Sequence, residues 1–385
     1  MSAGARIVAS LASEEHAESV AAFYREVWDP SATTETVIAS MRASAAANVA
    51  APGEPLPTAL VLQGSRVIGY CSSIAQRLWD GKTERPAYWV KGLMVLPEFR
   101  NGPIGFLAVK ELTRHLPCAT ILTVAPGAKR LFGALGYTDL GAITNWVKPL
   151  RPGVMANRLD LNALGLGNLP NWVGSGVRIA RKTGIASVGA SVAGVVMDAA
   201  AAATRMRSRR FATALETPDQ RELDALWASA RTGIEASPVR DATYLINRFG
   251  ASAPEGEFYT FVTARQRGRL AAIAVVRKPK ETSDPRLGGI RVATVSDALF
   301  HPTETNAGLA TLGAIARIAR AEKADALVCM SSHPLLTGLL RRQGYLRLRG
   351  NVHFFLRDVT GAGAWPPDRA SWWLGRGDGE SDATF

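Results

Sequence analysis

Residues 93–105 read LMVLPEFRNGPIG and carry the local pattern from which the fold is inferred. The apolar stretch up to Leu96 predicts a strand, and the segment from Pro103 onward predicts a helix, because proline is tolerated in a first helical turn. A strand that ends in a loop and leads into a helix can bind an anion, since free backbone N–H groups and the helix dipole point to one place. Either this loop binds a phosphate-bearing cofactor, or it is only a strand-to-helix turn.

The first 150 residues alternate between strand-like and helix-like patterns. A hairpin signal with Gly64 and Ser65 at the turn precedes a strand, a helix, a strand, a helix and a closing strand. From about residue 212 the same order repeats, with a hairpin at Arg267 and Gly268. This alternation predicts an α/β (α+β) mixed sheet and a duplicated fold. The expected parts are a domain over 1–150, a linker with an apolar helix over 151–211, a domain over 212–358 and a Trp/Asp-rich tail over 359–385.

The composition fits a packed globular protein, and 385 residues favour two domains. A net charge of +12 suits an anionic partner, but the basic residues are scattered without interleaved aromatics, so we expect no nucleic-acid partner. Cys71, Cys118 and Cys329 lie far apart in apolar stretches, which favours buried thiols over a disulfide or metal site. We therefore expect no metal. The cysteine usage and the absence of a secretory-signal pattern favour a cytoplasmic location.

The segment 95–105, VLPEFRNGPIG, resembles the first signature of the GNAT (Gcn5-related N-acyltransferase) superfamily. That signature is an apolar strand, a Pro-Glu-x-Arg turn and Arg/Gln-x-x-Gly-x-Gly/Ala at the start of a helix. Pro103 departs from it, because it replaces the middle glycine and has no N–H for a cofactor. The residues in register are Val95, Pro97, Glu98, Arg100 and Gly105.

The segment 128–137, AKRLFGALGY, resembles the second GNAT signature, which flanks the pantetheine of acyl-CoA. In the family a tyrosine that protonates the departing thiolate commonly stands at the position of Phe132, and phenylalanine has no such proton. Tyr137 is then the candidate for this catalytic role. The second half repeats both signatures in weaker form, since Gly308, Ala310 and Tyr345 keep the register while Thr305 and Leu340 depart from it.

The resemblance implies two GNAT-like domains in tandem, joined by a helical linker. Together with the segment 239–249, VRDATYLINRF, and the ending SWWLGRGDGESD (371–382), it resembles tandem GNAT proteins associated with bacterial exopolysaccharide and cell-envelope biosynthesis. It implies a transferase that moves an acyl group from acetyl-CoA or another acyl-CoA to an amine or hydroxyl of a sugar, a small molecule or a lipid-linked sugar. The implied cofactor-binding residues are Met94, Val95, Arg100, Asn101, Gly102, Ile104, Gly105 and Phe132.

Several catalytic roles stay open. Glu98 is a candidate general base for the acceptor amine, or else a solvated turn carboxylate. Asp297, His301 and His333 follow strands of the second half, where either an acid/base role or a structural role fits. Two other functions also stay open: a catalytically inactive GNAT-fold binding or scaffold protein of envelope polysaccharide assembly, and an aminoacyl-tRNA-dependent transferase.

The segment 183–204 is apolar and is flanked by arginines, among them Arg209 and Arg210. Asp198 and the many small residues make it a weak membrane span. The leading expectation is a linker helix buried between the halves, and the second is an in-plane helix with arginines on acidic headgroups at the inner face of the membrane. In the tail, we expect Trp365, Trp372 and Trp373 to dock on the second half, with Asp378, Glu380 and Asp382 either lining an acceptor cleft or solvated.

Overall fold

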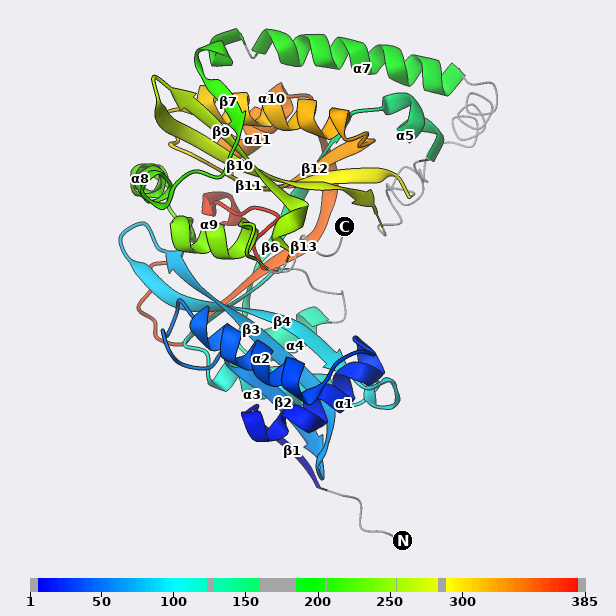
Figure 1. Ribbon diagram of the computed structural model, residues 1–385, viewed down its shortest axis with the longest axis vertical. Helices are drawn as coiled ribbons and strands as arrows, with labels where there is room; N and C mark the ends of the chain where they lie inside the picture. Colours follow the sequence, from blue (N-terminus) through cyan, green and yellow to red (C-terminus); the bar gives the residue numbers. More distant parts are fainter. Residues whose placement is uncertain are drawn as a thin grey trace. The chain divides into compact units, whose positions relative to one another are not determined.

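The computed structural model describes residues 6–122, 128–158, 185–204, 206–253, 255–282 and 289–379. The chain forms two compact units, and each combines two separate stretches of the sequence, whose colours in Figure 1 follow the residue number. Unit 1 comprises Met1–Gly141 and His353–Trp365, and unit 2 comprises Ala142–Val352 and Pro366–Phe385. The predicted mixed α/β fold with two domains is confirmed.

Unit 1 is a mixed sheet in the strand order β1-β2-β3-β4-β5-β13. Strands β1 to β4 are antiparallel neighbours, and the β2–β3 turn at Gly64 and Ser65 confirms the first predicted hairpin. Side chains of α1 and α3 share one buried core with these strands, which positions the loop before α3. The elements are β1 (Ile7–Leu11), α1 (Ala17–Val27), α2 (Thr34–Ala46), β2 (Thr58–Gln63), β3 (Arg66–Trp79), β4 (Glu84–Val95), α3 (Ile104–Arg114), β5 (Cys118–Leu122), α4 (Ala128–Ala134) and β13 (Leu346–Asp358).

Unit 2 repeats the plan in the strand order β6-β12-β11-β10-β9-β7. The β9–β10 turn at Arg267 and Gly268 confirms the second predicted hairpin, and α10 packs along β9, β10 and β11 (Figure 1). The elements are β6 (Thr138–Pro149), α5 (Pro152–Arg158), α7 (Ile185–Thr204), β7 (Ala212–Leu215), α8 (Gln220–Ala230), β8 (Ser237–Pro238), α9 (Ala242–Phe249), β9 (Tyr259–Gln266), β10 (Arg269–Glu281), β11 (Arg291–Phe300), α10 (Thr305–Ala321), β12 (Ala326–Met330) and α11 (Pro334–Arg342).

Two strands are exchanged relative to a division of the chain at residue 150. Residues 354–358 of β13 pair with β5, whereas residues 145–149 of β6 pair with β12. The sheet of each unit is therefore completed by a strand from the end of the other sequence half. A boundary at a single residue does not describe this arrangement.

The apolar helix of the linker is α7, and residues 159–184 before it lie outside the described residues. The window Ser187–Thr204 has a mean hydropathy of 1.4 and is long and apolar enough to cross a membrane, yet only 6% of it is buried. The expectation of a buried linker helix is therefore wrong for this segment. Within unit 2, Asp198 of this helix accepts a hydrogen bond from Lys148 Nζ at 3.1 Å and also pairs with Arg320.

Candidate functional site

The loop from β4 to α3 has the geometry of an anion-binding site. After β4, residues 97–99 form a short 3-10 helix, and α3 begins at Ile104. The first amide of α3 with an intrahelical acceptor is that of Leu107, which donates to Pro103 O at 2.9 Å. The amides of residues 104–106 therefore point out of the helix end without an intrahelical acceptor, as helix geometry requires. Pro103 is the N-cap and contributes no donor.

Packing does not require the glycine at position 105. A Cβ placed on Gly105 would lie 3.7 Å from Val95 Cγ2, an ordinary van der Waals distance. Arg100 is exposed, and its Nε donates to Val95 O at 3.2 Å, which holds the guanidinium at the end of β4. Asn101 and Gly102 are also exposed, whereas Met94 is half-buried and Ile104 is buried. The loop thus combines a positive charge, outward amides and room for a group close to the backbone.

Strand β4 leads directly into this loop. Among the described residues, its parallel pairing with β5 is at Tyr88 with Ala119 and at Trp89 with Thr120. Its ladder with β3 continues beyond Trp89 and is interrupted by an irregularity near Gly92, whose φ of +60° favours glycine. Residues 90–95 are all half-buried or exposed. This stretch of β4 is therefore partly accessible to solvent.

Glu98 lies on the surface beside this loop. Its Oε1 accepts a hydrogen bond from Arg66 Nη2 at 2.9 Å, and the same nitrogen contacts Glu26 Oε1 at 3.2 Å. The side chains of Glu98 and Arg66 are about half exposed. This geometry fits the turn role of Glu98, because its carboxylate is held in a surface ion pair at the outer side of the 3-10 helix.

The structure places Phe132 and Tyr137 inside the core of unit 1. Their rings meet edge to face at 5.4 Å between centroids, and Phe132 also packs on Phe355 at 5.9 Å. The hydroxyl of Tyr137 lies 3.1 Å from Thr113 Oγ1, and burial raises the pKa of this phenol above its usual value. A buried phenol with a raised pKa is poorly suited to donate a proton to a thiolate, so we do not assign Tyr137 the acid role. Phe132 is likewise a packing residue here.

The corresponding loop of unit 2 is closed by its own packing. A Cβ on Gly308 would lie 2.7 Å from Phe300 Cε1, so this glycine serves the contact between α10 and β11. The amides of Glu304 and Ala307 donate to the carbonyls of His301 and Glu304 at 2.7 and 2.8 Å. The unit 1 loop also uses the amides of Arg100 and Gly102 internally, so the two loops differ chiefly in the tight packing at Gly308.

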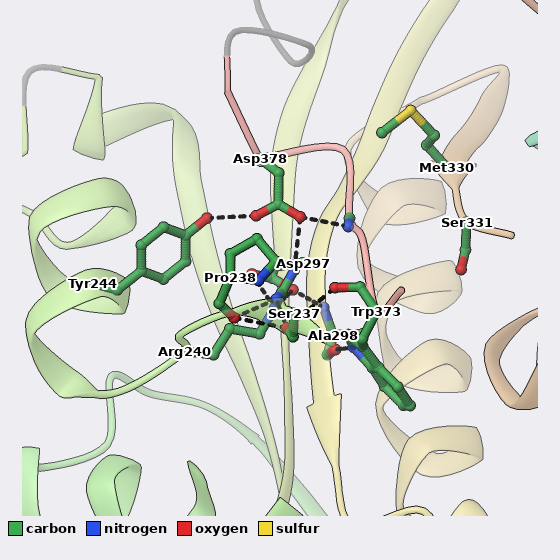
Figure 2. Close-up of polar contacts among 12 residues, drawn as sticks. Ser237, Pro238, Arg240, Tyr244, Asp297, Ala298, Met330, Ser331, Trp373 and Asp378 are labelled. Carbon is green, nitrogen blue, oxygen red and sulfur yellow. Dashed lines mark hydrogen bonds and ion pairs between the residues drawn. The ribbon is translucent and has the colours of Figure 1, made fainter. Parts of the chain in front are cut away.

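A buried polar cluster lies beside the end of β11 (Figure 2). Arg240 is fully buried, and its Nε donates to Asp297 Oδ1 at 2.8 Å while its Nη2 donates to Asp378 Oδ2, also at 2.8 Å. The Tyr244 hydroxyl donates to Asp378 Oδ1 at 3.0 Å. Burial, with the Asp378 charge nearby, raises the pKa of Asp297 to about 6, although Arg240 opposes this shift. Arg240, Tyr244, Asp297 and Asp378 thus form a buried network of ion pairs and hydrogen bonds, which we call the ionic lock.

The structure separates the three acid/base candidates of the second half. Asp297 belongs to the lock, and burial lowers the pKa of His333 to about 4 beside the ring of Trp373, 4.7 Å away. Both are buried, so neither is accessible as an acid or base. His301 lies near the surface, where its Nδ1 is 2.7 Å from Thr303 Oγ1. Sequence reasoning missed Arg240, whose only sequence signal was its place in the 239–249 segment.

The tryptophans of the tail divide between the units. Trp372 and Trp373 are buried in unit 2, as predicted, but Trp365 lies in unit 1, where its Nε1 donates to Asp358 Oδ2 at 2.8 Å. The expectation that all three dock on the second half is wrong for Trp365. Asp378 is buried in the lock and not solvated, while Glu380 and Asp382 lie outside the described residues.

The two units define a protein with the fold of the GCN5-related N-acetyltransferases. No family model and no curated protein matches the sequence. Among solved structures, GCN5-related N-acetyltransferases from Anabaena variabilis and Kribbella flavida each align with a TM-score of 0.56 and 12% identity; the alignments cover 92% and 94% of this chain and 73% and 74% of theirs. Saccharomyces cerevisiae N-myristoyltransferase with bound myristoyl-CoA aligns with a TM-score of 0.54 and 12% identity, over 91% of this chain and 82% of that one.

Proposed function

We propose that the protein is an acyltransferase that binds acyl-CoA in unit 1. The observation that carries this proposal is the contrast between equivalent strands. Residues 90–95 of β4 are half-buried or exposed and lead to outward amides, whereas residues 292–300 of β11 are all buried. The bound myristoyl-CoA of the yeast transferase, and the activity named for the other similar structures, support an acyl-CoA donor.

In the proposed reaction the pyrophosphate lies over residues 100–105, and the pantetheine arm follows the partly exposed residues 90–95 of β4. An acceptor amine or hydroxyl attacks the thioester carbonyl, the C–S bond breaks, and the products are the acylated acceptor and CoA. A backbone N–H near the end of β4 polarises the carbonyl oxygen. The acceptor class proposed here is a sugar or another cell-envelope precursor, including lipid-linked sugars, and it rests on the resemblance of the motifs.

Calorimetric titration with acetyl-CoA and myristoyl-CoA tests the donor site. We expect micromolar binding to the unmodified chain. Arg100→Glu reverses a charge at the cradle and Gly105→Trp fills it, so each variant should weaken binding at least tenfold, about 1.4 kcal/mol or more. Lys82→Glu, on an exposed hairpin turn, makes the same charge change elsewhere and should bind normally. Absence of binding to the unmodified chain would reject the donor site.

A second candidate function is a GNAT-fold binding or scaffold protein without catalysis. The burial of Tyr137 and the surface ion pair of Glu98 favour it, because neither residue is placed for proton transfer. Release of free CoA thiol from acetyl-CoA, assayed with a panel of amino sugars, separates the two functions. Donor binding without thiol release on any acceptor, together with sugar binding, would favour the scaffold.

We also propose that α7 attaches the protein peripherally to an anionic membrane surface. Val188, Val192, Val195 and Val196 are 60% to 70% exposed and recur at helical spacing, so they form one apolar stripe. Arginines lie near the C-terminal end of α7. Thr204 Oγ1 donates to the backbone oxygen of Arg342 on α11 at 3.2 Å. The exposed Arg209 and Arg210 follow α7 in sequence. An apolar stripe with a basic margin suits in-plane binding to acidic lipid.

Vesicle cosedimentation tests this attachment. We expect binding to vesicles that contain phosphatidylglycerol, weaker binding to pure phosphatidylcholine vesicles, and loss of binding in Val192→Glu/Val195→Glu. A matched control is Leu215→Glu, an exposed apolar residue on β7. Equal sedimentation with both vesicle types and for all variants would reject the proposal.

A further inference from the structure

We propose that residues 372–379 are a built-in occupant of the slot in unit 2 that corresponds to the donor slot of unit 1, so that each chain binds a single acyl-CoA. The slot is the edge of β11 that β12 leaves free. The count of one donor rests on the proposed function of unit 1, whereas the occupancy of the slot stands on the contacts of unit 2 alone.

The slot begins where β12 leaves β11. The two strands pair in parallel from Val292 with Ala326 to Val295 with Cys329, and β11 then continues to Phe300. β12 ends at Met330, and the next amide, that of Ser331, donates to Thr144 O at 3.0 Å.

The C-terminal segment bonds the carbonyls of β11 beyond this point. The amide of Gly377 donates to Ser296 O at 2.6 Å. Trp373 Nε1 donates to Ala298 O at 2.9 Å (Figure 2). Ser296 is the extra residue of an irregularity in the β10–β11 pairing, which lies between Val295 and Asp297. The segment thus supplies hydrogen-bond donors to β11 beyond the point where β12 stops pairing with it.

The glycines of the segment fit this close approach. A Cβ on Gly375 would lie 2.9 Å from Ser296 O, and a Cβ on Gly377 would lie 2.5 Å from Phe249 Cζ. Larger residues could not keep the backbone against β11. On the other side of the slot, the Trp373 ring packs edge to face on Phe300 with 5.0 Å between centroids.

Side chains at and before α9 hold the segment in place. Tyr244 and Arg248 are four residues apart, so they share a face of the helix. Tyr244 bonds Asp378, while Arg248 Nη2 donates to Gly379 O at 2.8 Å and its Nε donates to Gly377 O at 3.2 Å. Asp378 Oδ2 also accepts from the amide of Gly375 at 2.8 Å and from Arg240. A pantetheine arm could enter the slot only if the segment moved out of it. Asp378 would then be lost from the buried network of Arg240 and Asp297, and removing one partner from such a network is costly.

The stoichiometry of donor binding is the first test. Equilibrium dialysis with labelled acetyl-CoA should give one site per chain, and that site should be lost in Gly105→Trp. Two sites, of which one survives in Gly105→Trp, would overturn the inference but keep the proposed function. No site at all would reject the proposed function, and the occupancy of unit 2 is then decided by the second test.

Hydrogen exchange tests the occupancy without any ligand. The amides of Trp373, Gly375 and Gly377 donate to Ala236 O, Asp378 Oδ2 and Ser296 O, so they should be protected in the full chain. Asp378→Asn, and the milder Tyr244→Phe, should speed exchange at Gly375 and Gly377 by at least about tenfold. Asp368→Asn is the control, since Asp368 only caps the short helix at 369–371. Fast exchange of these glycines in the unmodified chain, or no change in both variants, would overturn the inference.

Discussion

The hydroxyl of Tyr244 donates a 3.0 Å hydrogen bond to Asp378, which lies 134 residues further along the chain. This bond joins the two segments of the second half whose composition was most unusual, VRDATYLINRF and SWWLGRGDGESD. The two segments hold each other in place. The 239–249 segment supplies the cation of Arg240 and the phenol of Tyr244, and the tail supplies the carboxylate of Asp378 and the glycines that pack closely.

Loss of the Arg240 cation should strongly destabilise unit 2. Arg240→Met leaves the buried carboxylates of Asp297 and Asp378 without their cation, so we expect the free energy of unfolding to fall by about 3–5 kcal/mol. Urea denaturation measures it. Arg240→Met combined with Asp297→Asn and Asp378→Asn should recover part of the loss, because no charge is then left unpaired. A loss below about 1 kcal/mol in the single variant would contradict the lock, since surface ion pairs contribute that little.

The tail glycines should tolerate no methyl group. Gly377→Ala places a Cβ against the Phe249 ring and should lower the free energy of unfolding by about 1–3 kcal/mol, as overpacking does. The matched control is Gly338→Ala on α11, where a Cβ meets nothing within 4 Å. There the gain in helix propensity should stabilise by up to about 1 kcal/mol. Thermal melting of both variants compares them, and equal effects would argue against the close approach of the tail.

The stability of unit 2 should fall in mild acid because of His333. Burial lowers the pKa of His333 from 6.5 to about 4, against the opposing effect of Glu235. Between these values the unfolded chain binds a proton that the folded chain does not, so stability present above pH 6.5 is lost as the pH falls toward 4. The full effect corresponds to roughly 3 kcal/mol. In His333→Phe the drop in melting temperature between neutral and acid pH should be smaller, and an unchanged drop would show that other groups cause it.

Removal of the Tyr137 hydroxyl should leave the reaction intact. Tyr137→Phe deletes a buried hydrogen bond to Thr113, so we expect a loss of stability of about 1 kcal/mol and little change in turnover. Steady-state kinetics on the active acceptor measures turnover, with Arg100→Glu as the variant that should impair it. A general acid contributes roughly 10²- to 10⁴-fold to a rate. A loss of that size at saturating substrate would restore Tyr137 to the catalytic centre.

Local patterns predicted the elements of this protein well. The turns at Gly64 and Gly268, both with positive φ, and the strand–loop–helix around Arg100 follow from short-range preferences that act within a few residues. The cap of α8 is equally local, because the carboxylate of Asp219 accepts from the amide of Glu222 at 2.8 Å. Local patterns could not show that Tyr137 and Phe132 are buried, because burial depends on which other parts of the chain pack over a side chain.

By itself the sequence determined the mixed α/β class and the strand–loop–helix around Arg100, because periodicity and glycine placement act locally. Only the tertiary structure decided that β6 and β13 are exchanged between the two sheets, and that the chain's own tail covers one of two equivalent strand edges. These outcomes depend on contacts such as Arg240 with Asp378, 138 residues apart. Complementary charge and shape in the folded core determine which residues form such contacts, and the sequence of either segment alone does not reveal them.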